Sequence, residues 1–331
     1  MNSSFYPLLF KQNKKTLVWG TEDWTVSAVP GSESVVENGE WADTKLTEII
    51  ANHPTGILGK AVAKRYNNQL PLLTKIIDAK QDLSIQVHPN DEMAMREHNK
   101  FGKSEMWYIL DAKQEACLYA GFRQQITQEE CKERITNGTI TEVLAKHEVH
   151  KGDVFYLPAG RVHAICGGIL LAEVQQSSDV TYRIFDYNRP GLDGKPRELH
   201  TELAAKALDY HVIDNYRTEY AETPNNAIQI IDSPYFSVRI MEVSKSFHRD
   251  LRKYDSFIIT MCIEGDCRIR VRGTGEEILL KQGNSTLIPA AIANYDVIPL
   301  NGETRILDAF IDNMDRSIAS KVTRFLHITE K

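Results

Sequence analysis

Short runs of β-type residues, separated by turn residues, recur along most of this 331-residue chain and constrain its fold more than any other feature. Between about 70 and 120 they include LPLLTKII, LSIQVH and EMWYIL, and after about 226 nearly every segment has this character. Strands at such spacing are typical of sandwiches and barrels rather than of βαβ units. The chain has no GxGxxG or Walker loop, so the usual nucleotide-binding folds are not indicated.

Three helical segments interrupt the β pattern. A short helix is predicted within residues 89–99, and a longer one over 126–146, which opens on the capping box Thr127-x-x-Glu130. A third is predicted over 198–211. We therefore expect a mainly β chain with two modules, residues 1–225 with the helical segments and residues 226–331 without them.

Two segments of the chain have similar sequences, which supports the prediction of two related modules. KGDVFYLPAGRVHAI (151–165) and KQGNSTLIPAAIANYDV (281–297) share a glycine followed six residues later by Pro-Ala. Five residues after that proline stands His163 in the first copy and Asn294 in the second. A duplication would place function in the first copy, which kept a metal-ligand type. The alternative is that both are unrelated strand–turn–strand units with proline at the corner.

Composition excludes several classes of protein. Apolar residues make up 42% and charged residues 25%, and the net charge of −6 argues against nucleic-acid or anionic-membrane binding. No apolar run approaches the ~20 residues that span a bilayer, and the first residues do not resemble a secretory signal. Five cysteines without a CxxC pair are typical of the reduced thiols of a cytoplasmic protein.

Polar residues share one face of several predicted strands. Because alternate side chains of a strand point the same way, Ser84, Gln86 and His88 lie on one face and apolar residues on the other. The same alternation recurs in four more strands, with Lys103 and Glu105, Arg161 and His163, Glu173 and Gln175, and Asp179, Thr181 and Arg183. Such rows either face solvent or line a barrel, where charges must be paired or bind a metal.

Two histidines, one carboxylate and a neutral amide are suitable ligands for Zn²⁺ or another borderline divalent ion. With a position left for water or substrate, this is the pattern of a catalytic site rather than of a closed structural one.

These motifs, taken in order, resemble the type I phosphomannose isomerases of the cupin superfamily. The matching stretches are VWGTEDW, PGSESVVENG, QVHPND, GKSEMWY, PAGRVHAI and VTYRIFDYNR. The short helical segment at 126–146 resembles the compact bacterial form of the family. Two features depart from its pattern: Thr21 follows Trp19-Gly20 where a second glycine is usual, and the C-terminal stretch has no clear match to a phosphate-binding basic residue.

The resemblance implies two cupin-like jelly-roll β-barrel modules. Because Asn294 stands where His163 stands in the first copy, and no Gln-x-His precedes it, we expect only the first module to bind metal. It implies one Zn²⁺ per chain, and a site whose assigned residues are the ligands Gln86, His88, Glu105 and His163, the catalytic Arg183, and Ser84 and Lys103 beside the sugar phosphate. We add Arg161 as a further cation for substrate binding. The expected partner is a small sugar phosphate, with no nucleic acid or membrane, and the chain is expected to be a monomer or weak homo-oligomer.

The function implied is interconversion of mannose 6-phosphate and fructose 6-phosphate through a cis-enediol(ate). Glu173 is the first candidate for the base, with a zinc-bound hydroxide or a histidine as alternatives. Glu173 could equally orient Arg183 or a metal ligand, and Arg183 could be a structural arginine paired with Asp186 or Glu173.

Two other function classes use similar residues. A cupin-type non-haem metal oxygenase also needs two histidines and a carboxylate, and a non-catalytic sugar-phosphate-binding cupin needs none of the ligands. The cations Lys103, Arg161 and Arg183 favour an anionic phosphate over dioxygen, and all four predicted ligands are present. Both observations favour the isomerase.

Overall fold

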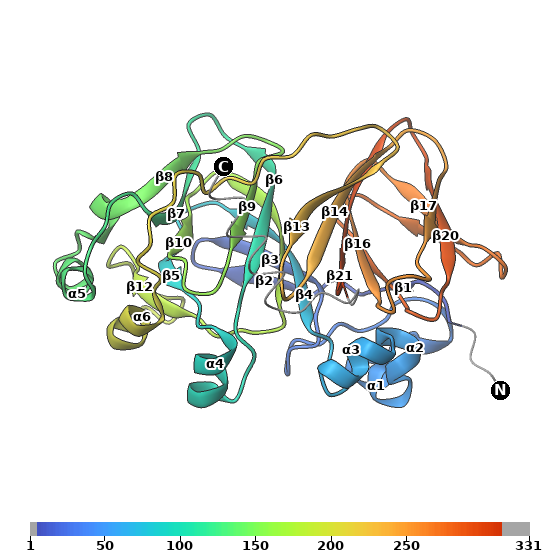
Figure 1. The fold of residues 1–331 in the computed structure, drawn as a ribbon, viewed down its shortest axis with the longest axis horizontal. Helices are drawn as coiled ribbons and strands as arrows, with labels where there is room; N and C mark the ends of the chain where they lie inside the picture. The colour runs from blue at the N-terminus through green and yellow to red at the C-terminus, as the bar shows by residue number, and fades with distance from the viewer. Residues whose placement is uncertain (1–4, 313–331) are drawn as a thin grey trace. The chain divides into compact units, whose positions relative to one another are not determined.

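The computed structural model describes residues 5–312, which group into two compact units (Figure 1). The central unit comprises residues 14–23 and 75–218, and the terminal unit comprises 5–13, 24–74 and 219–312. This grouping differs from the expected division after residue 225, because residues 24–74 contact the C-terminal part of the chain. Residues 313–331 of the expected second module lie outside the described residues.

The central unit contains a five-stranded sheet and most of a six-stranded sheet, whose residues 24–26 and 72–74 group with the terminal unit. The first has the order β12-β5-β10-β7-β8, with β5 (Ile85–Val87), β7 (Cys117–Phe122), β8 (Leu144–Glu148), β10 (His163–Ile165) and β12 (Tyr182–Phe185). The second has the order β2-β3-β4-β11-β6-β9, with β2 (Lys14–Leu17), β3 (Gly20–Val26), β4 (Leu72–Ala79), β6 (Glu105–Ala112), β9 (Val154–Leu157) and β11 (Ile169–Gln176).

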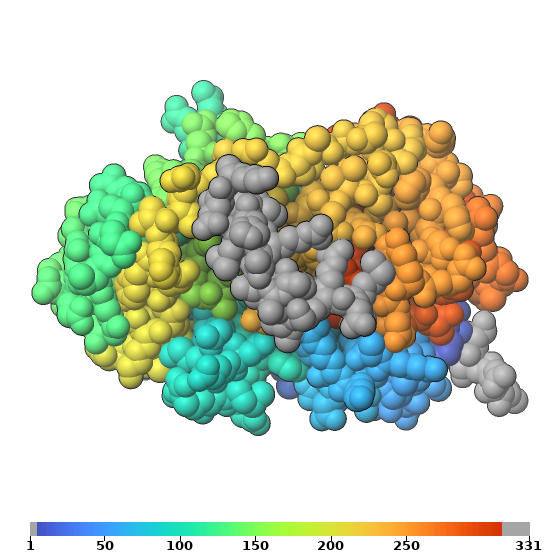
Figure 2. Space-filling view, in the orientation of Figure 1, coloured from blue at the N-terminus to red at the C-terminus, as the bar shows by residue number. Residues whose placement is uncertain are grey.

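The two faces of the five-stranded sheet pack against different apolar clusters. Leu118, Ala120 and Ile165 point inward and pack against Trp107 and Ile109 of the other sheet. The outward residues form a second cluster, in which helices α5 (Gln128–Thr136) and α6 (Thr201–Ala207) cover the sheet. Figure 2 shows these two helices side by side at the surface.

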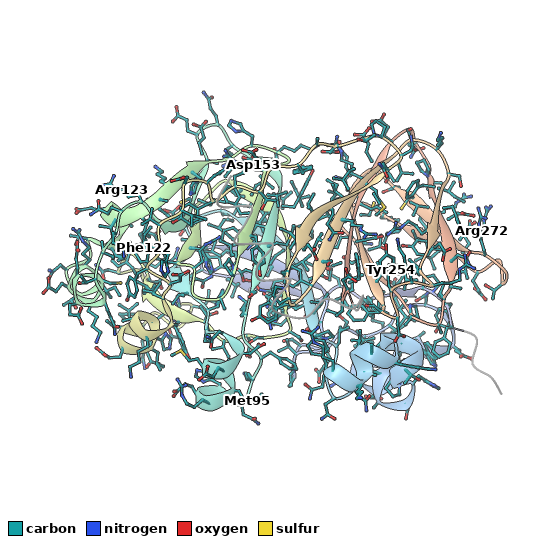
Figure 3. The ribbon with its side chains drawn as sticks, in the orientation of Figure 1. Met95, Phe122, Arg123, Asp153, Tyr254 and Arg272 are labelled. Atoms are coloured by element: carbon teal, nitrogen blue, oxygen red, sulfur yellow. The ribbon has the colours of Figure 1, made fainter. Side chains whose placement is uncertain are left out.

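The alternation is interrupted near the end of β7, where Gly121 has a φ of 78° and the register against β8 shifts, so that Phe122 lies on the outer face although Ala120 lies on the inner one. Phe122 is fully buried under the helices, whereas the next residue, Arg123, is exposed (Figure 3).

The two sheets with a core between them form a jelly-roll sandwich, as the β pattern predicted, although neither sheet closes into a barrel.

The terminal unit repeats the arrangement of two sheets. One has the order β1-β19-β16-β21-β14-β13, with β1 (Leu8–Leu9), β13 (Ala227–Asp232), β14 (Ser237–Val243), β16 (Ile258–Glu264), β19 (Ser285–Ile288) and β21 (Thr304–Phe310). The other has the order β15-β20-β17-β18, with β15 (Phe247–Asp250), β17 (Cys267–Val271), β18 (Glu277–Leu280) and β20 (Asn294–Pro299). Apolar residues of both sheets form one core.

The two similar segments adopt the same backbone. Gly152 and Gly283 both have a left-handed φ, of 94° and 83°, before a strand that is directly followed by proline. After that proline the same turn follows, in which Arg161 N donates to Pro158 O and Ile292 N donates to Pro289 O. His163 and Asn294 then each begin a strand in the opposite sheet. The shared geometry supports duplication over a chance match.

Helix α4 (Asp91–His98) forms within the predicted segment, and its N-cap Asn90 accepts from the backbone N–H of Met93. In α5, Thr127 accepts from Glu130 N, so the predicted cap is present. The expectation of a helix to residue 146 is wrong: α5 ends at Thr136 and a 3₁₀ turn, η2 (Ile140–Val143), leads into β8. Residues 144–148 are extended because they pair with β7.

The sequence patterns predict no helix between residues 39 and 70, yet four short ones lie there. They are η1 (Gly39–Trp41), α1 (Leu46–Asn52), α2 (Pro54–Leu58) and α3 (Lys60–Arg65), all in the terminal unit. Within residues 5–312, no helix has the length and apolar character needed to cross a membrane.

Candidate metal centre

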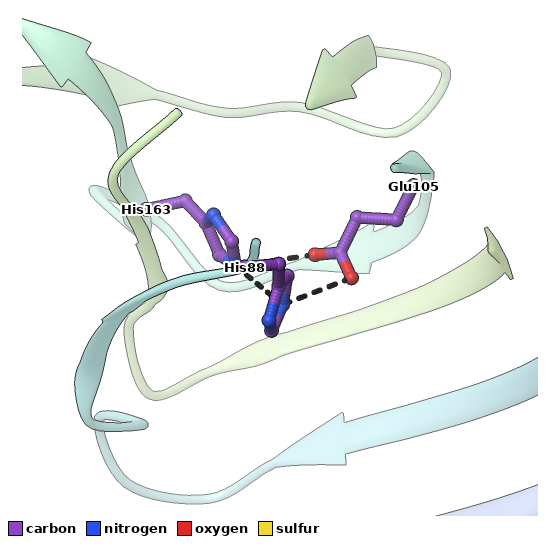
Figure 4. A group of neighbouring side chains, drawn as sticks. All are labelled: His88, Glu105 and His163. Carbon is purple, nitrogen blue, oxygen red and sulfur yellow. Dashed lines mark hydrogen bonds and ion pairs between the residues drawn. The ribbon is translucent and has the colours of Figure 1, made fainter. Parts of the chain in front are cut away.

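Three predicted ligands converge inside the central unit (Figure 4). His88 directly follows β5, Glu105 begins β6 and His163 begins β10. One ligand atom from each lies within 4.8 Å of the others, and all three side chains are at least 99% buried. Of the residues described, this is the one group of histidine, cysteine and acidic side chains with metal-binding geometry.

Backbone carbonyls fix both imidazole rings. His88 Nδ1 lies 3.0 Å from Val180 O, and His163 Nδ1 lies 2.8 Å from Arg161 O. A carbonyl only accepts, so each Nδ1 must donate, and each neutral ring then presents an Nε2 lone pair. The two Nε2 atoms are 3.2 Å apart. A cation between them would remove the repulsion of two facing lone pairs.

After the two facing imidazole nitrogens, the carboxylate of Glu105 is the second observation that indicates a cation site. Neither of its buried carboxylate oxygens has a hydrogen bond. The Lys103 ammonium faces Oε2 from 3.1 Å, whereas Oε1 lies 3.2 Å from His163 Nε2. Buried carboxylate oxygens that lack hydrogen bonds are costly unless a positive charge faces them. Two imidazole nitrogens and a carboxylate suit a borderline divalent ion such as Zn²⁺.

The protonation states at the site are those that bind metal. Burial, reinforced by Lys103, lowers the pKa of His88 to about 3, and burial also lowers the pKa of His163. Burial by itself would raise the pKa of Glu105, but Lys103 and the two imidazoles outweigh it and hold this pKa well below its usual range. Neutral imidazoles and an ionised carboxylate need not lose protons to bind a metal.

Gln86 lies beside the cluster because of the strand register. It is paired with His163 across the β5–β10 ladder, and its Nε2 lies 3.4 Å from His163 Nε2. The amide can turn so that its oxygen faces the same point. The structure therefore brings all four predicted ligand residues together.

Lys103 and Ser84 are buried in the same unit. The Lys103 ammonium lies 3.0 Å from His88 Nε2 and 3.1 Å from Glu105 Oε2, so it borders the cluster directly. Ser84 is 4% exposed and stands two residues ahead of Gln86 on the chain.

Arg183 also lies on the Gln86 side of the sheet. Its β12 position is paired with Gln86, while its neighbours Tyr182 and Ile184 join the apolar cluster on the opposite face. Its Nη1 donates to Glu198 O, at 2.9 Å, and its buried Nε has no hydrogen-bond partner.

The alternative pairings considered for Arg183 are absent from the described structure. Asp186 is paired with Arg189 and Arg197, through contacts of 2.9 and 2.6 Å. Glu173 is paired with Lys75 instead. Neither carboxylate therefore holds the Arg183 guanidinium.

Arg161 contacts the metal cluster through its backbone carbonyl and not through its side chain. Its carbonyl accepts from His163 Nδ1, whereas its guanidinium donates to Tyr156 O at 2.9 Å and lies 5.1 Å from the centre of the Tyr216 ring. These contacts favour a role in orienting His163 over direct contact with substrate.

Glu173 belongs to a buried charged row that the sequence patterns did not reveal. Its Oε2 lies 2.8 Å from Lys75 Nζ, and its Oε1 accepts from Trp107 Nε1 at 2.9 Å. The Trp107 ring in turn stands edge-on to the His163 ring, with centroids 5.3 Å apart. The charge of Lys75 within the apolar run LLTKII was the one available signal.

Within this buried charged row, the pKa values of Glu173 and Lys75 are both raised. Burial raises the pKa of Glu173, against the opposing effect of Lys75, and the nearby charge of Glu105 adds to the rise. Burial would lower the pKa of Lys75, but Glu173 and Glu22 outweigh it and raise it. The two directions are compatible because Lys75 has two carboxylate neighbours, whereas Glu173 is buried near a second negative charge.

The comparisons with known proteins agree with this geometry. The family model for the phosphomannose isomerase type I catalytic domain matches residues 12–136, and that for the mannose-6-phosphate isomerase cupin domain matches residues 226–310. Mannose-6-phosphate isomerase ManA of Bacillus subtilis is 36% identical over 309 residues, which cover 87% of this chain and 95% of that one. The probable mannose-6-phosphate isomerase GmuF of the same organism is 36% identical over 279 residues, covering 83% and 85%.

Solved structures show the same architecture. The crystal structure of mannose 6-phosphate isomerase from Bacillus subtilis aligns with a TM-score of 0.81 and 28% identity, covering 92% of this chain and 99% of that one. A putative mannosephosphate isomerase from Archaeoglobus fulgidus, at 20% identity and a TM-score of 0.76, shares the fold over 93% and 98%. With its buried ligand cluster, matching domains and relatives of nearly equal length, this chain belongs to the type I phosphomannose isomerase family.

Proposed function

We propose that this chain interconverts mannose 6-phosphate and fructose 6-phosphate, with Zn²⁺ held by Gln86, His88, Glu105 and His163. The observation that carries the proposal is the convergence of two imidazole nitrogens and a carboxylate within 4.8 Å of one another in one buried site. Membership of the phosphomannose isomerase family supports the reaction class.

The ion, when bound, supplies positive charge beside the substrate oxygens. The chain's own part is to hold the ligands in their binding forms. The carbonyls of Val180 and Arg161 keep each Nε2 unprotonated, and Lys103 keeps Glu105 ionised. The mixed nitrogen and oxygen donor set favours zinc over a hard ion such as Mg²⁺.

An aldose–ketose isomerisation moves a proton between C1 and C2 through a cis-enediol(ate), so negative charge develops on oxygen. Arg183 stands beside Gln86 and retains an Nε–H that no acceptor of the described structure occupies. A planar, permanently charged fork is suited to two neighbouring oxygens. We assign Arg183 to stabilising this charge and Lys103, at the edge of the cluster, to the anionic substrate.

Glu173 had two possible roles, and its contacts favour the second. Both of its oxygens face a donor, the Lys75 ammonium and the Trp107 indole N–H. A general base needs a free oxygen aimed at the proton it removes. We therefore assign Glu173 to positioning Trp107 against His163.

The test is a coupled assay. Protein of known zinc content is supplied with mannose 6-phosphate, and fructose 6-phosphate formation is followed in air and under strict anaerobic conditions. We expect turnover that requires bound metal and is the same in both atmospheres, because an isomerisation has no net redox change. A zinc-replete protein without turnover would refute the proposal, and a rate that vanishes without oxygen would favour an oxygenase.

A further inference from the structure

Two cysteines far apart in the sequence face each other on the outer face of the five-stranded sheet. Cys117 begins β7, and Cys166 follows the last residue of β10. The β7–β10 ladder pairs Ile165 with Leu118, and the next step is a hydrogen bond of 3.2 Å from Cys166 N to Cys117 O. The two cysteines are therefore direct cross-strand neighbours.

This register gives a separation that a disulfide can span. Residues of a hydrogen-bonded antiparallel pair have Cα atoms about 5.5 Å apart, which lies inside the usual range for disulfides of about 4.4–6.8 Å. The side chains also point the same way, because Leu118 and Ile165, one position along each strand, both face the inner core. The two thiols are close enough for a hydrogen bond between them.

Cys117 has the features of a reactive thiol. It is partly exposed, whereas Cys166 is buried. The hydrogen bond from the Cys166 thiol, with a smaller contribution from Lys146, lowers the pKa of Cys117 to about 7 against the opposing effects of burial and Asp82. Lys146 shares this face, since it is paired with Tyr119 on the neighbouring strand β8. A lowered pKa favours the thiolate, which is the form of cysteine that reacts.

Solvent can approach this corner of the unit. A surface hollow of about 570 Å³ is lined by residues that include Asp82 and Gly167. Gly167 directly follows Cys166, and the Asp82 charge acts on both thiols. Neither thiol lines the hollow, and none of its lining residues belongs to the metal cluster; solvent therefore reaches the chain next to Cys166 away from the metal centre, and Cys117 itself is partly exposed.

We propose that Cys117 and Cys166 form a dithiol that hydrogen peroxide converts to a disulfide. The Cys117 thiolate attacks one peroxide oxygen, breaking the O–O bond, and leaves a sulfenic acid and, after proton uptake, one water. The Cys166 sulfur then attacks the Cys117 sulfur and displaces the hydroxyl, which leaves as a second water with the Cys166 proton. Two thiols and one peroxide give one disulfide and two waters.

A second cysteine pair provides an internal comparison. Cys262 and Cys267 flank the β16–β17 turn, and each affects the pKa of the other, but both are at least 99% buried. The Cys262 sulfur also lies 3.0 Å from Gly265 O. Because reaction requires access as well as thiolate character, we expect Cys262 and Cys267 to stay reduced in the folded protein.

The experiment treats the folded, metal-containing full chain with hydrogen peroxide, blocks the remaining thiols with an alkylating reagent and maps the peptides by mass spectrometry. We expect a peptide linking Cys117 to Cys166 that has lost two hydrogens and that a thiol reductant separates. The matched variant Cys131→Ser, which removes a buried thiol elsewhere, should form the same linked peptide.

Two further variants test the order of events. Cys166→Ser should stop at a Cys117 sulfenic acid, which a 1,3-dicarbonyl reagent traps, and Lys146→Met should slow the linkage in an otherwise intact chain. The proposal is overturned if Cys117 remains alkylatable after peroxide treatment, or if it is oxidised in the wild-type protein without linking to Cys166.

Discussion

Arg183 on β12 lies directly opposite Gln86 on β5, so the predicted catalytic arginine and a predicted metal ligand share one face of the sheet. The same row continues to His163 on β10. This relationship follows from strand register and cannot be seen from sequence spacing, because ninety-odd residues separate the two strands.

The register leads to a prediction for Arg183→Ala. If Arg183 stabilises charge that appears only in the transition state, kcat should fall by about 10²–10³-fold with little change in zinc content or folding. Arg183→Lys should recover part of the rate, because an ammonium keeps the charge but loses the fork. Steady-state kinetics on metal-replete variants provide the measurement, and Arg268→Ala, an exposed arginine of the terminal unit, is the control. An unchanged kcat would make Arg183 structural, and a rise in KM alone would make it a ground-state phosphate clamp.

The contacts of Glu173 predict that Glu173→Gln retains most of kcat. The amide oxygen can still accept from Trp107 Nε1, so the indole keeps its position against His163. Glu173→Leu, which cannot accept, should lose both activity and zinc affinity. A loss of 10²–10⁴-fold in kcat in the Gln variant, with normal zinc content, would instead identify Glu173 as the general base.

Lys75 is predicted to be a stability residue. Lys75→Met removes the ammonium next to the buried Glu173 carboxylate, and breaking such a pair typically costs about 3–5 kcal/mol. Adding Glu173→Gln should restore part of that loss, because no buried charge then lacks a partner. Urea unfolding of the single and double variants measures both effects. Equal stability of all three proteins would show that the pair contributes nothing.

The pKa of His88 predicts how acid affects the metal-free protein. The unfolded chain takes up a proton at His88 near pH 6.5, whereas the folded chain does so only near pH 3. Between these values the unfolded state binds more protons, so stability falls as the pH is lowered, by about 1.4 kcal/mol per unit for this group. Unfolding of metal-free wild type and His88→Asn across this range isolates the contribution. Parallel pH profiles would mean that His88 is not held neutral.

The metal ligands were the part of the site most accessible from sequence. Strand alternation grouped Gln86 with His88 and Lys103 with Glu105, and the family resemblance joined the groups; the structure brings them together. The end of α5 could not be predicted, because residues 144–148 are extended only through pairing with the distant strand β7. Likewise, β1 near the N-terminus groups with the C-terminal part of the chain because Leu8 is paired with Leu287. Local sequence patterns do not reveal a pairing over so long a distance in the chain.

The absence of metal from the second module remains a prediction, and the register now gives it a physical basis. Leu157 and Ile288 both directly precede the proline that the two similar segments share. Leu157 is paired with the predicted ligand Glu105, whereas Ile288 is paired with Ile258. Asn294 likewise replaces His163, and is paired with Asp250 where His163 is paired with Gln86. Isoleucine cannot ligate, so a zinc anomalous-scattering peak beside Asn294 would contradict this interpretation.

The central claim is that isomerase activity depends on the buried cluster, and His163→Ala tests it most directly. The variant and the control His150→Ala, whose exposed imidazole lies beside Glu148, are purified alike and measured for zinc content and for turnover of mannose 6-phosphate. The account predicts that His163→Ala loses both zinc and activity, because three remaining ligands hold the ion poorly, while His150→Ala keeps both. Full zinc occupancy and normal turnover in His163→Ala would contradict it.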